Sequence, residues 1–186
     1  MKLYFHVDRL GNLSPGHVIE KEQYRNESIL PAIMPYADER YLKHLEKLCR
    51  DGLSLHGAGY ITVGLKRSRV EAVNLLLELQ FEYVRHIYNE NMPSRLQSLF
   101  AFSNLYAAQE FKRAKGDSGK IFEIDFSGRC FVGDMNWITA SLNVEEQKQH
   151  AMQYWMGRPF STKRDYIPQW ECVIDLPVTI GREVTD

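Results

Sequence analysis

Hydrophobic residues alternate with polar ones, or gather in short runs, at four places along the chain, and these patterns predict β-strands. The four predicted strands span residues 2–7, 96–102, 121–126 and 170–180. Ser127-Gly128-Arg129 is a turn signal, so residues 130–132 are expected to return as a hairpin on the third strand. The residues after Ile180, numbers 181–186, are expected to form a short solvated tail.

A helical period appears in the segments between these strands. The strongest predicted helix spans residues 68–88, and its apolar stripe consists of Val70, Val73, Leu77, Phe81 and Val84. Further helices are predicted at 37–50, 105–115 and 144–156, with Asn104 and Asn143 as N-caps of the last two. A short helix is expected at 134–141, a loop at 28–36, and a flexible connection or hairpin at the glycine-rich residues 53–64.

Composition limits the class of protein. The chain has 186 residues, of which 44% are hydrophobic and 25% charged, with a net charge of -1. These values are typical of a globular protein, and they argue against disorder and against a strongly basic nucleic-acid-coating protein. No apolar run is long enough to cross a bilayer. We therefore expect one α+β domain over residues 1–186.

The cysteines and histidines indicate the cellular location and whether a metal site is expected. Cys49, Cys130 and Cys172 are isolated and odd in number, and no secretory hydrophobic segment follows Met1. Both observations favour a reducing, cytoplasmic location. The six histidines are scattered without metal-like spacing, so no metal site is expected.

Polar residues lie within three of the predicted strands, where a packed sheet tolerates them only if they are paired or face a ligand. His6 is either a hydrogen-bonded core residue or a ligand contact. Ser98 and Phe100 share one face of their strand and would place a hydroxyl beside an aromatic wall. Glu171 is either an exposed residue of an alternating strand or a catalytic carboxylate. Arg9 shares a face with His6 only if the strand ends or bulges before Arg9.

These three segments resemble, in order, the motifs of the ADP-ribosyltransferase-like superfamily. The motif residues lie in the runs Leu3-Tyr4-Phe5-His6-Val7, Ser98-Leu99-Phe100-Ala101-Phe102 and Trp170-Glu171-Cys172-Val173. The resemblance implies split antiparallel or mixed sheets around a cleft for NAD, flanked by helices. It implies that Glu171 stands beside the reacting ribose and that NAD, as substrate, is bound by His6, Arg9, Ser98, Phe100 and Tyr106.

Gln169, two residues before Glu171, is then expected on the acceptor side. His6 matches the His-type branch of the superfamily whereas Ser98 matches the Arg/Ser-type branch, so the branch stays open.

The implied activity is mono-ADP-ribosyl transfer from NAD to a macromolecule with release of nicotinamide, a glycosyltransferase reaction. The expected setting is a microbial toxin or effector, in a toxin–antitoxin or antiviral defence system, with an antitoxin or inhibitor as partner. The acceptor is nucleic acid, for which Arg158, Lys163 and Arg164 would supply a basic edge, or protein. The alternatives are a catalytically inactive binding module of the same fold and a nucleic-acid-binding domain without catalysis.

Overall fold

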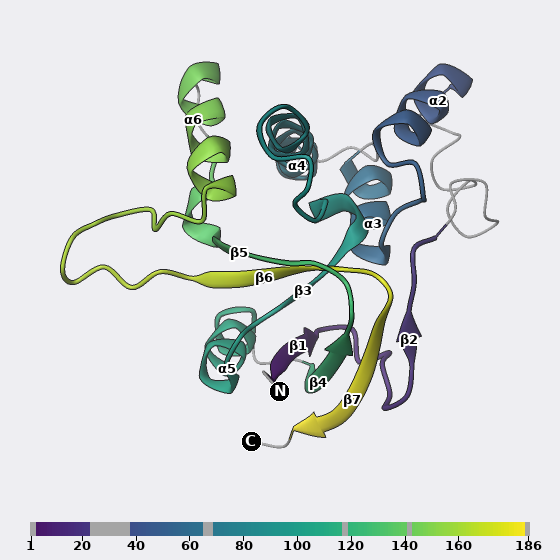
Figure 1. Cartoon of the computed structure of the whole chain (residues 1–186), viewed down its shortest axis with the longest axis vertical. Helices are drawn as coiled ribbons and strands as arrows, with labels where there is room; N and C mark the ends of the chain where they lie inside the picture. Colours follow the sequence, from purple (N-terminus) through teal and green to yellow (C-terminus); the bar gives the residue numbers. More distant parts are fainter. Residues whose placement is uncertain (1–2, 23–37, 65–68, 117–118, 141–142, 185–186) are drawn as a thin grey trace.

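The computed structural model describes residues 3–22, 38–64, 69–116, 119–140 and 143–184 (Figure 1). Its strands are β1 (Tyr4–Asp8), β2 (Val18–Ile19), β3 (Ser98–Ala101), β4 (Lys120–Phe126), β5 (Cys130–Asp134), β6 (Trp170–Asp175) and β7 (Val178–Val184). Its helices are α2 (Glu39–Leu48), α3 (Leu55–Gly64), α4 (Arg69–Tyr88), α5 (Leu105–Ala114) and α6 (Val144–Trp155), with 3-10 turns η1 (Arg95–Gln97) and η2 (Met135–Trp137).

The strands form two separate sheets. The four-stranded sheet has the order β1-β4-β7-β2 and the three-stranded sheet the order β3-β6-β5, and every pairing is antiparallel. Because β3 is the edge strand of its sheet, the backbone on its outer side is available to other elements. Phe102, just after β3, uses this position to form a bridge with Phe5 of β1. The predicted α+β class with antiparallel sheets is confirmed.

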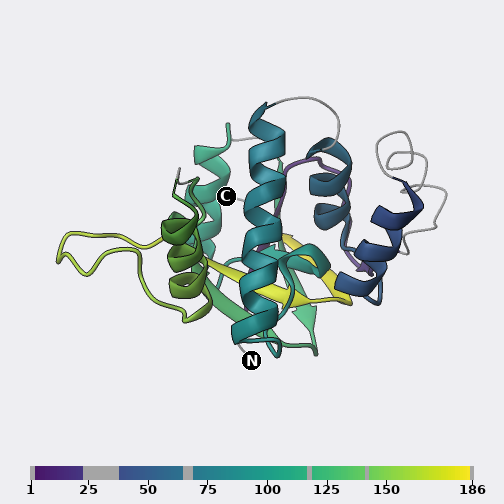
Figure 2. The same ribbon diagram turned by 90° about the horizontal axis from the view of Figure 1, so that it is seen from above.

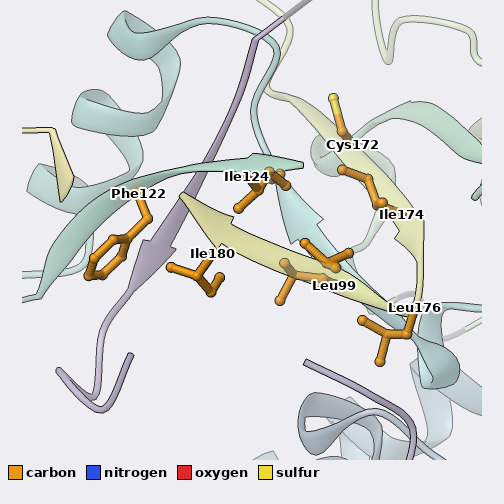
Figure 3. Packing of buried hydrophobic residues seen from close by; sticks show 9 residues of the cluster. Leu99, Phe122, Ile124, Cys172, Ile174, Leu176 and Ile180 are labelled. Atoms are coloured by element: carbon orange, nitrogen blue, oxygen red, sulfur yellow. The ribbon is translucent and has the colours of Figure 1, made fainter. Parts of the chain in front are cut away.

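The main core lies between the two sheets (Figure 3). Leu99, Cys172 and Ile174 of the three-stranded sheet pack with Phe122, Ile124 and Ile180 of the other sheet. These side chains alternate with residues that point to the opposite face, as a strand period of two requires.

Helices cover the remaining faces. Phe81 and Val84 of α4, together with Ala151, Tyr154 and Trp155 of α6, pack on Phe131 and Val173, which lie on the outer face of the three-stranded sheet. Helix α5 packs through Ala108 on Phe5 and Val7 of β1. Figure 2 shows α4 running between α6 on one side and α3 and α2 on the other.

Three predicted helices are confirmed, two of them together with their predicted N-caps. Asp38 accepts a hydrogen bond from the backbone N–H of Tyr41 at the start of α2. Asn104 and Asn143 likewise cap α5 and α6, as predicted.

The glycine-rich segment after Leu53 was expected to be a flexible connection or a hairpin, and this prediction is wrong because it forms α3. The Ser54 hydroxyl accepts from the Gly57 N–H, in the manner of an N-cap, and donates to the carbonyl of Leu96. A Cβ at Gly57 would lie 2.0 Å from that carbonyl oxygen, so only glycine lets α3 approach η1 so closely. The glycine here permits close helix packing and does not signal flexibility.

The last predicted strand is in fact two strands. Residues 170–175 form β6 in one sheet, and β7 begins at Val178 in the other. Pro177, which has no N–H to donate, lies between them. The expected solvated tail is also wrong as far as Val184, because Val184 and Glu183 pair with Ile121 and Phe122 of β4.

The predicted hairpin between residues 121–126 and 130–132 is wrong as well. Strand β5 leaves β4 and pairs with β6, while β4 pairs with β1 and β7. The predicted strand 96–102 starts as the 3-10 turn η1, and the helix expected at 134–141 is reduced to η2. The loop expected at 28–36 lies outside the described residues.

The apolar stripe predicted for α4 is wrong in part. Val73 is 40% exposed, whereas Phe81 and Val84 are fully buried. The buried face of the helix is therefore rotated away from the predicted stripe, and it includes the charged residues Glu78, Glu82 and Arg85. Within the described part of the chain, no helix is both long and apolar enough to span a membrane.

Candidate active site

Arg95 is the centre of a buried polar cluster next to β3. It lies in η1, where Ser94 accepts a hydrogen bond from the Leu96 N–H, and its side chain is only 4% exposed. Its Nε and Nη2 donate to the two carboxylate oxygens of Glu78 on α4, at 2.8 and 2.9 Å. Such a two-point pair fixes both the position and the orientation of the guanidinium.

The third nitrogen of Arg95 reaches Glu171. Nη1 donates to Oε1 of Glu171 on β6 and to the Tyr154 hydroxyl of α6, the latter at 2.7 Å. Tyr154 in turn donates to the same Oε1 at 2.8 Å. Four elements, η1, α4, α6 and β6, therefore meet through charge-assisted hydrogen bonds.

Glu171 is buried, with 4% of the residue exposed, and it points to the helix-covered face of the three-stranded sheet. Burial raises the pKa of this carboxyl above its ordinary value of 4.5, and the opposing effects of Arg95 and the Tyr154 hydroxyl do not cancel the rise. Two carboxylates, Glu78 and Glu171, thus share one guanidinium, and Glu78 adds to the rise in the pKa of Glu171.

Phe100 connects this cluster to β1. The Arg95 guanidinium carbon lies 4.6 Å from the centre of the Phe100 ring, and the ring of His56 on α3 lies 4.6 Å from it at a steep angle. The carbonyl oxygen of Phe100 is 2.7 Å from Nδ1 of His6. Since a carbonyl can only accept, His6 carries its proton on Nδ1, and its Nε2 is an acceptor when the ring is neutral.

Both histidines are held in the neutral form. Burial lowers the pKa of His56 from 6.5 to about 4, with Arg95, Arg9 and His6 adding to this effect. Burial also lowers the pKa of His6, and the hydrogen bond to Phe100, which acts to raise this pKa, does not cancel the effect. At neutral pH the site therefore has uncharged imidazoles on β1 and α3, next to the charged guanidinium of Arg95.

Tyr60 is the last member of the cluster on α3. Its ring contacts that of His56 edge-on at 4.5 Å, and its hydroxyl hydrogen-bonds Glu78.

The structure brings most of the predicted residues into one neighbourhood. His6, Phe100 and Glu171 are linked through Phe100 and Arg95, although His6 and Glu171 do not touch directly. Arg9 was expected to share a face with His6 only if the strand ended before Arg9, and β1 does end at Asp8. The charge of Arg9 lowers the pKa of His6.

Ser98 lies one residue beyond η1, on the same strand face as Phe100 and fully buried. Its hydroxyl has no hydrogen-bond partner among the described residues.

Gln169, just before β6, is exposed, and its backbone N–H donates a hydrogen bond to Asp134. Tyr106 is 69% exposed on α5, and no hydrogen bond or ring contact of the described residues joins it to the cluster. The described part of the chain also contains no group of three or more potential metal ligands.

A comparison with family models matches residues 4–186 to the family described as "Protein of unknown function (DUF2441)". The chain belongs to this family. A search of curated proteins gave no match.

In this DUF2441 chain, sequence reasoning missed Arg95, Glu78, His56 and Tyr154 as members of the site. Glu78 carried a usable signal, because it lies three residues from both Leu75 and Phe81 and therefore on a buried face of the helix. A charged residue in phase with core residues indicates a buried partner. For Arg95 and Tyr154 no such signal exists, since their partners lie 76 and 17 residues away in the chain.

Proposed function

We propose that this protein is an NAD-dependent ADP-ribosyltransferase in which Glu171 is the catalytic carboxylate and His6 holds the nucleotide. One observation carries the proposal. The three segments that resemble the superfamily motifs converge on Phe100, with His6 on its carbonyl and with Arg95, over its ring, bonded to Glu171.

The reaction breaks the bond between the nicotinamide nitrogen and C1′ of its ribose, and nicotinamide leaves as a neutral molecule. The acceptor forms the new bond to C1′ and loses a proton. C1′ carries positive charge in the transition state, which an ionised carboxylate stabilises. Because the pKa of Glu171 is raised, turnover should fall with decreasing pH earlier than an ordinary carboxyl would make it fall.

The neighbours of Glu171 have separate roles in this proposal. Arg95 is a positioning residue, and its two bonds to Glu78 satisfy it even when Glu171 is engaged by substrate. The Nε2 of His6 accepts from a hydroxyl of the nucleotide, with Arg9 beside it for the diphosphate. Ser98 and Phe100 face the nicotinamide side, Gln169 lies on the acceptor side, and Tyr106 belongs to the nicotinamide contacts only through the resemblance.

A second candidate is a catalytically inactive binding module of the same fold. The burial of Glu171 favours it, because a carboxylate that is 4% exposed and bonded to both Arg95 and Tyr154 has the surroundings of a structural ion pair. The module would bind a nucleotide through His6 and Arg9 without releasing nicotinamide.

The proposed biological setting is a cytoplasmic toxin or effector of a microbial toxin–antitoxin or antiviral defence system. An antitoxin or inhibitor would then cover the site. Growth arrest on expression of the wild-type chain, relieved by Glu171→Gln, is the expected result. Equal arrest by both proteins would contradict this role for the activity.

The activity itself is tested by incubating the purified protein with two labelled forms of NAD, one labelled in the nicotinamide ring and one in the adenylate phosphate. Protein, RNA and DNA pools are supplied separately. Released nicotinamide together with adenylate label on one pool is expected. Nucleotide binding without nicotinamide release would support the inactive module, and neither binding nor release would overturn both proposals.

A further inference from the structure

A cluster of aromatic rings lies beside the start of β6, outside the polar cluster described above. It consists of Trp137 of η2, His150 of α6, and Phe160 and Tyr166 of the segment between α6 and β6. The ring of Trp137 lies 4.7 Å from that of Phe160 and 5.3 Å from that of His150. Phe160 lies 6.4 Å from Tyr166 and is itself 41% exposed. A large exposed ring supported from behind by other rings is a rigid stacking surface.

A single carboxylate holds this surface in place. Asp134, at the end of β5, accepts from the backbone N–H of Phe160 at 2.9 Å, from the Tyr166 hydroxyl at 2.5 Å and from the Gln169 N–H at 3.0 Å. Burial alone would raise the pKa of Asp134, but these hydrogen bonds outweigh it and lower the pKa. An ionised Asp134 therefore fixes both ends of the segment.

The same anchor sets the segment beside Glu171. Asp134 pairs with Trp170, and the preceding Gly133 pairs with Glu171. The segment itself extends away from the body of the molecule (Figure 1). A molecule lying on the rings would thus reach the acceptor side of the proposed active site.

The charge of the segment is positive. Residues 156–169 contain Arg158, Lys163 and Arg164 against the single acid Asp165, and all four side chains are exposed. The whole chain has a net charge of -1, so this positive charge is local. Cations that track phosphates, next to rings on which bases stack, are the two components of single-strand nucleic-acid binding.

We propose that this surface, formed by Trp137, His150, Phe160 and Tyr166 with the flanking cations, binds single-stranded nucleic acid and presents it as the acceptor. The role as acceptor rests on the proposed transferase activity, whereas the binding itself does not. Phe160 stacks on a base, and Lys163 and Arg164 neutralise phosphates.

Binding is measured by fluorescence anisotropy with a labelled 12-nucleotide RNA and DNA of the same sequence, without NAD. Phe160→Ala should weaken binding about tenfold or more, the effect of losing one stacked base, and Phe160→Trp should preserve it. Lys163→Glu with Arg164→Glu should weaken it further and reduce the slope of log affinity against log salt by about two.

Matched controls lie elsewhere on the surface. Lys43→Glu with Lys47→Glu makes the same change of charge on α2, at the opposite side of the molecule in Figure 2. Tyr83→Ala removes a ring that is 60% exposed on α4. Both controls should bind like the wild type. Thermal unfolding of each variant shows that a weakened affinity does not come from loss of folded protein.

The outcomes separate this inference from the proposed function. Nucleic-acid binding by the wild-type protein without nicotinamide release from NAD would overturn the transferase and leave a nucleic-acid-binding domain. Nicotinamide release with no binding by the wild type at 50 mM salt would overturn the inference alone. The inference would also be contradicted if poly-glutamate competed for the surface as strongly as RNA of equal charge, because such competition would show that the protein does not contact the bases.

Discussion

Two buried arginine clusters lie along the same side of α4, and they differ in what they connect. Arg85 and Arg95 are 6% and 3% exposed, and each bonds a fully or nearly fully buried glutamate of α4. Arg85 bonds Glu82 three residues away and donates to the carbonyls of Glu90 and Met92. All its hydrogen-bond partners within the described ranges lie within seven residues of it, so this cluster stabilises the C-terminal end of α4.

Arg95 uses the same chemistry over much longer separations. Its partners Glu78, Tyr154 and Glu171 lie 17, 59 and 76 residues away. It also lies over Phe100, whose ring contacts His56. Burial and ion pairing alone therefore do not mark a functional site. What distinguishes the Arg95 cluster is that Glu171, a carboxyl with a raised pKa, is connected through Arg95 and Phe100 to two neutral histidines.

The largest expected effect comes from removing each arginine. Arg95→Ala leaves Glu78 and Glu171 buried without a cation and should lower the free energy of unfolding by about 3–5 kcal/mol. Arg85→Ala should lower it by about 2 kcal/mol, because Glu82 keeps His86 within 3.5 Å. Urea unfolding at pH 7 measures both. Equal losses would remove the distinction between the clusters.

The second effect is a dependence of stability on pH that arises at His56. The pKa of His56 falls from 6.5 to about 4 on folding, so between these values the unfolded chain binds a proton that the folded chain does not. The contribution of His56 to the free energy of unfolding is therefore fully present above about pH 6.5 and is lost as the pH falls toward 4. The loss should reach about 3 kcal/mol by pH 4.

The variant that tests this effect is His56→Gln, which should make the free energy of unfolding less sensitive to pH in this range. Identical unfolding free energies against pH for wild type and His56→Gln would contradict the neutral His56.

Tyr154→Phe removes one hydroxyl that bonds both Arg95 and Glu171. We expect a loss of about 1–3 kcal/mol, since a buried acceptor is left with one bond fewer. Tyr83→Phe, on the exposed side of α4, should change stability by less than about 0.5 kcal/mol. Thermal unfolding of the pair tests whether Tyr154 belongs to the network.

The smallest effect is expected at Ser98, whose buried hydroxyl has no hydrogen-bond partner in the part of the chain that the structure describes. Ser98→Ala should leave stability unchanged or raise it by up to about 1 kcal/mol, whereas Ser54→Ala, which loses two hydrogen bonds, should lower it by about 1–2 kcal/mol. If Ser98 contacts the nicotinamide side of NAD, the same variant raises the KM for NAD. A destabilised Ser98→Ala protein would show that the hydroxyl is bonded within the fold.

The sequence predicts local features of this molecule well and long-range ones poorly. Asn104 and Asn143 were identifiable as caps because their partners lie two or three residues away. The division of residues 170–180 between two sheets depends on which strands lie beside them, which no local pattern specifies.

In the candidate site, too, local features could be predicted from the sequence and long-range contacts could not. His6, Phe100 and Glu171 were identifiable as polar or aromatic residues within strands. His56 was not identifiable, because residues 53–64 were expected to form a flexible connection or a hairpin and in fact contain α3. Arg95 was not identifiable either, because its partners come from three other elements.

The measurement that most directly tests the central claim compares nicotinamide release by Glu171→Gln and Glu82→Gln. Both substitutions neutralise a buried glutamate bonded to an arginine, so both have a similar structural effect. If Glu171 is the catalytic carboxylate, Glu171→Gln should lower kcat for nicotinamide release about 100-fold or more, and Glu82→Gln should leave kcat per folded molecule unchanged. Wild-type kcat in Glu171→Gln, or an equal fall in both variants, would contradict the assignment.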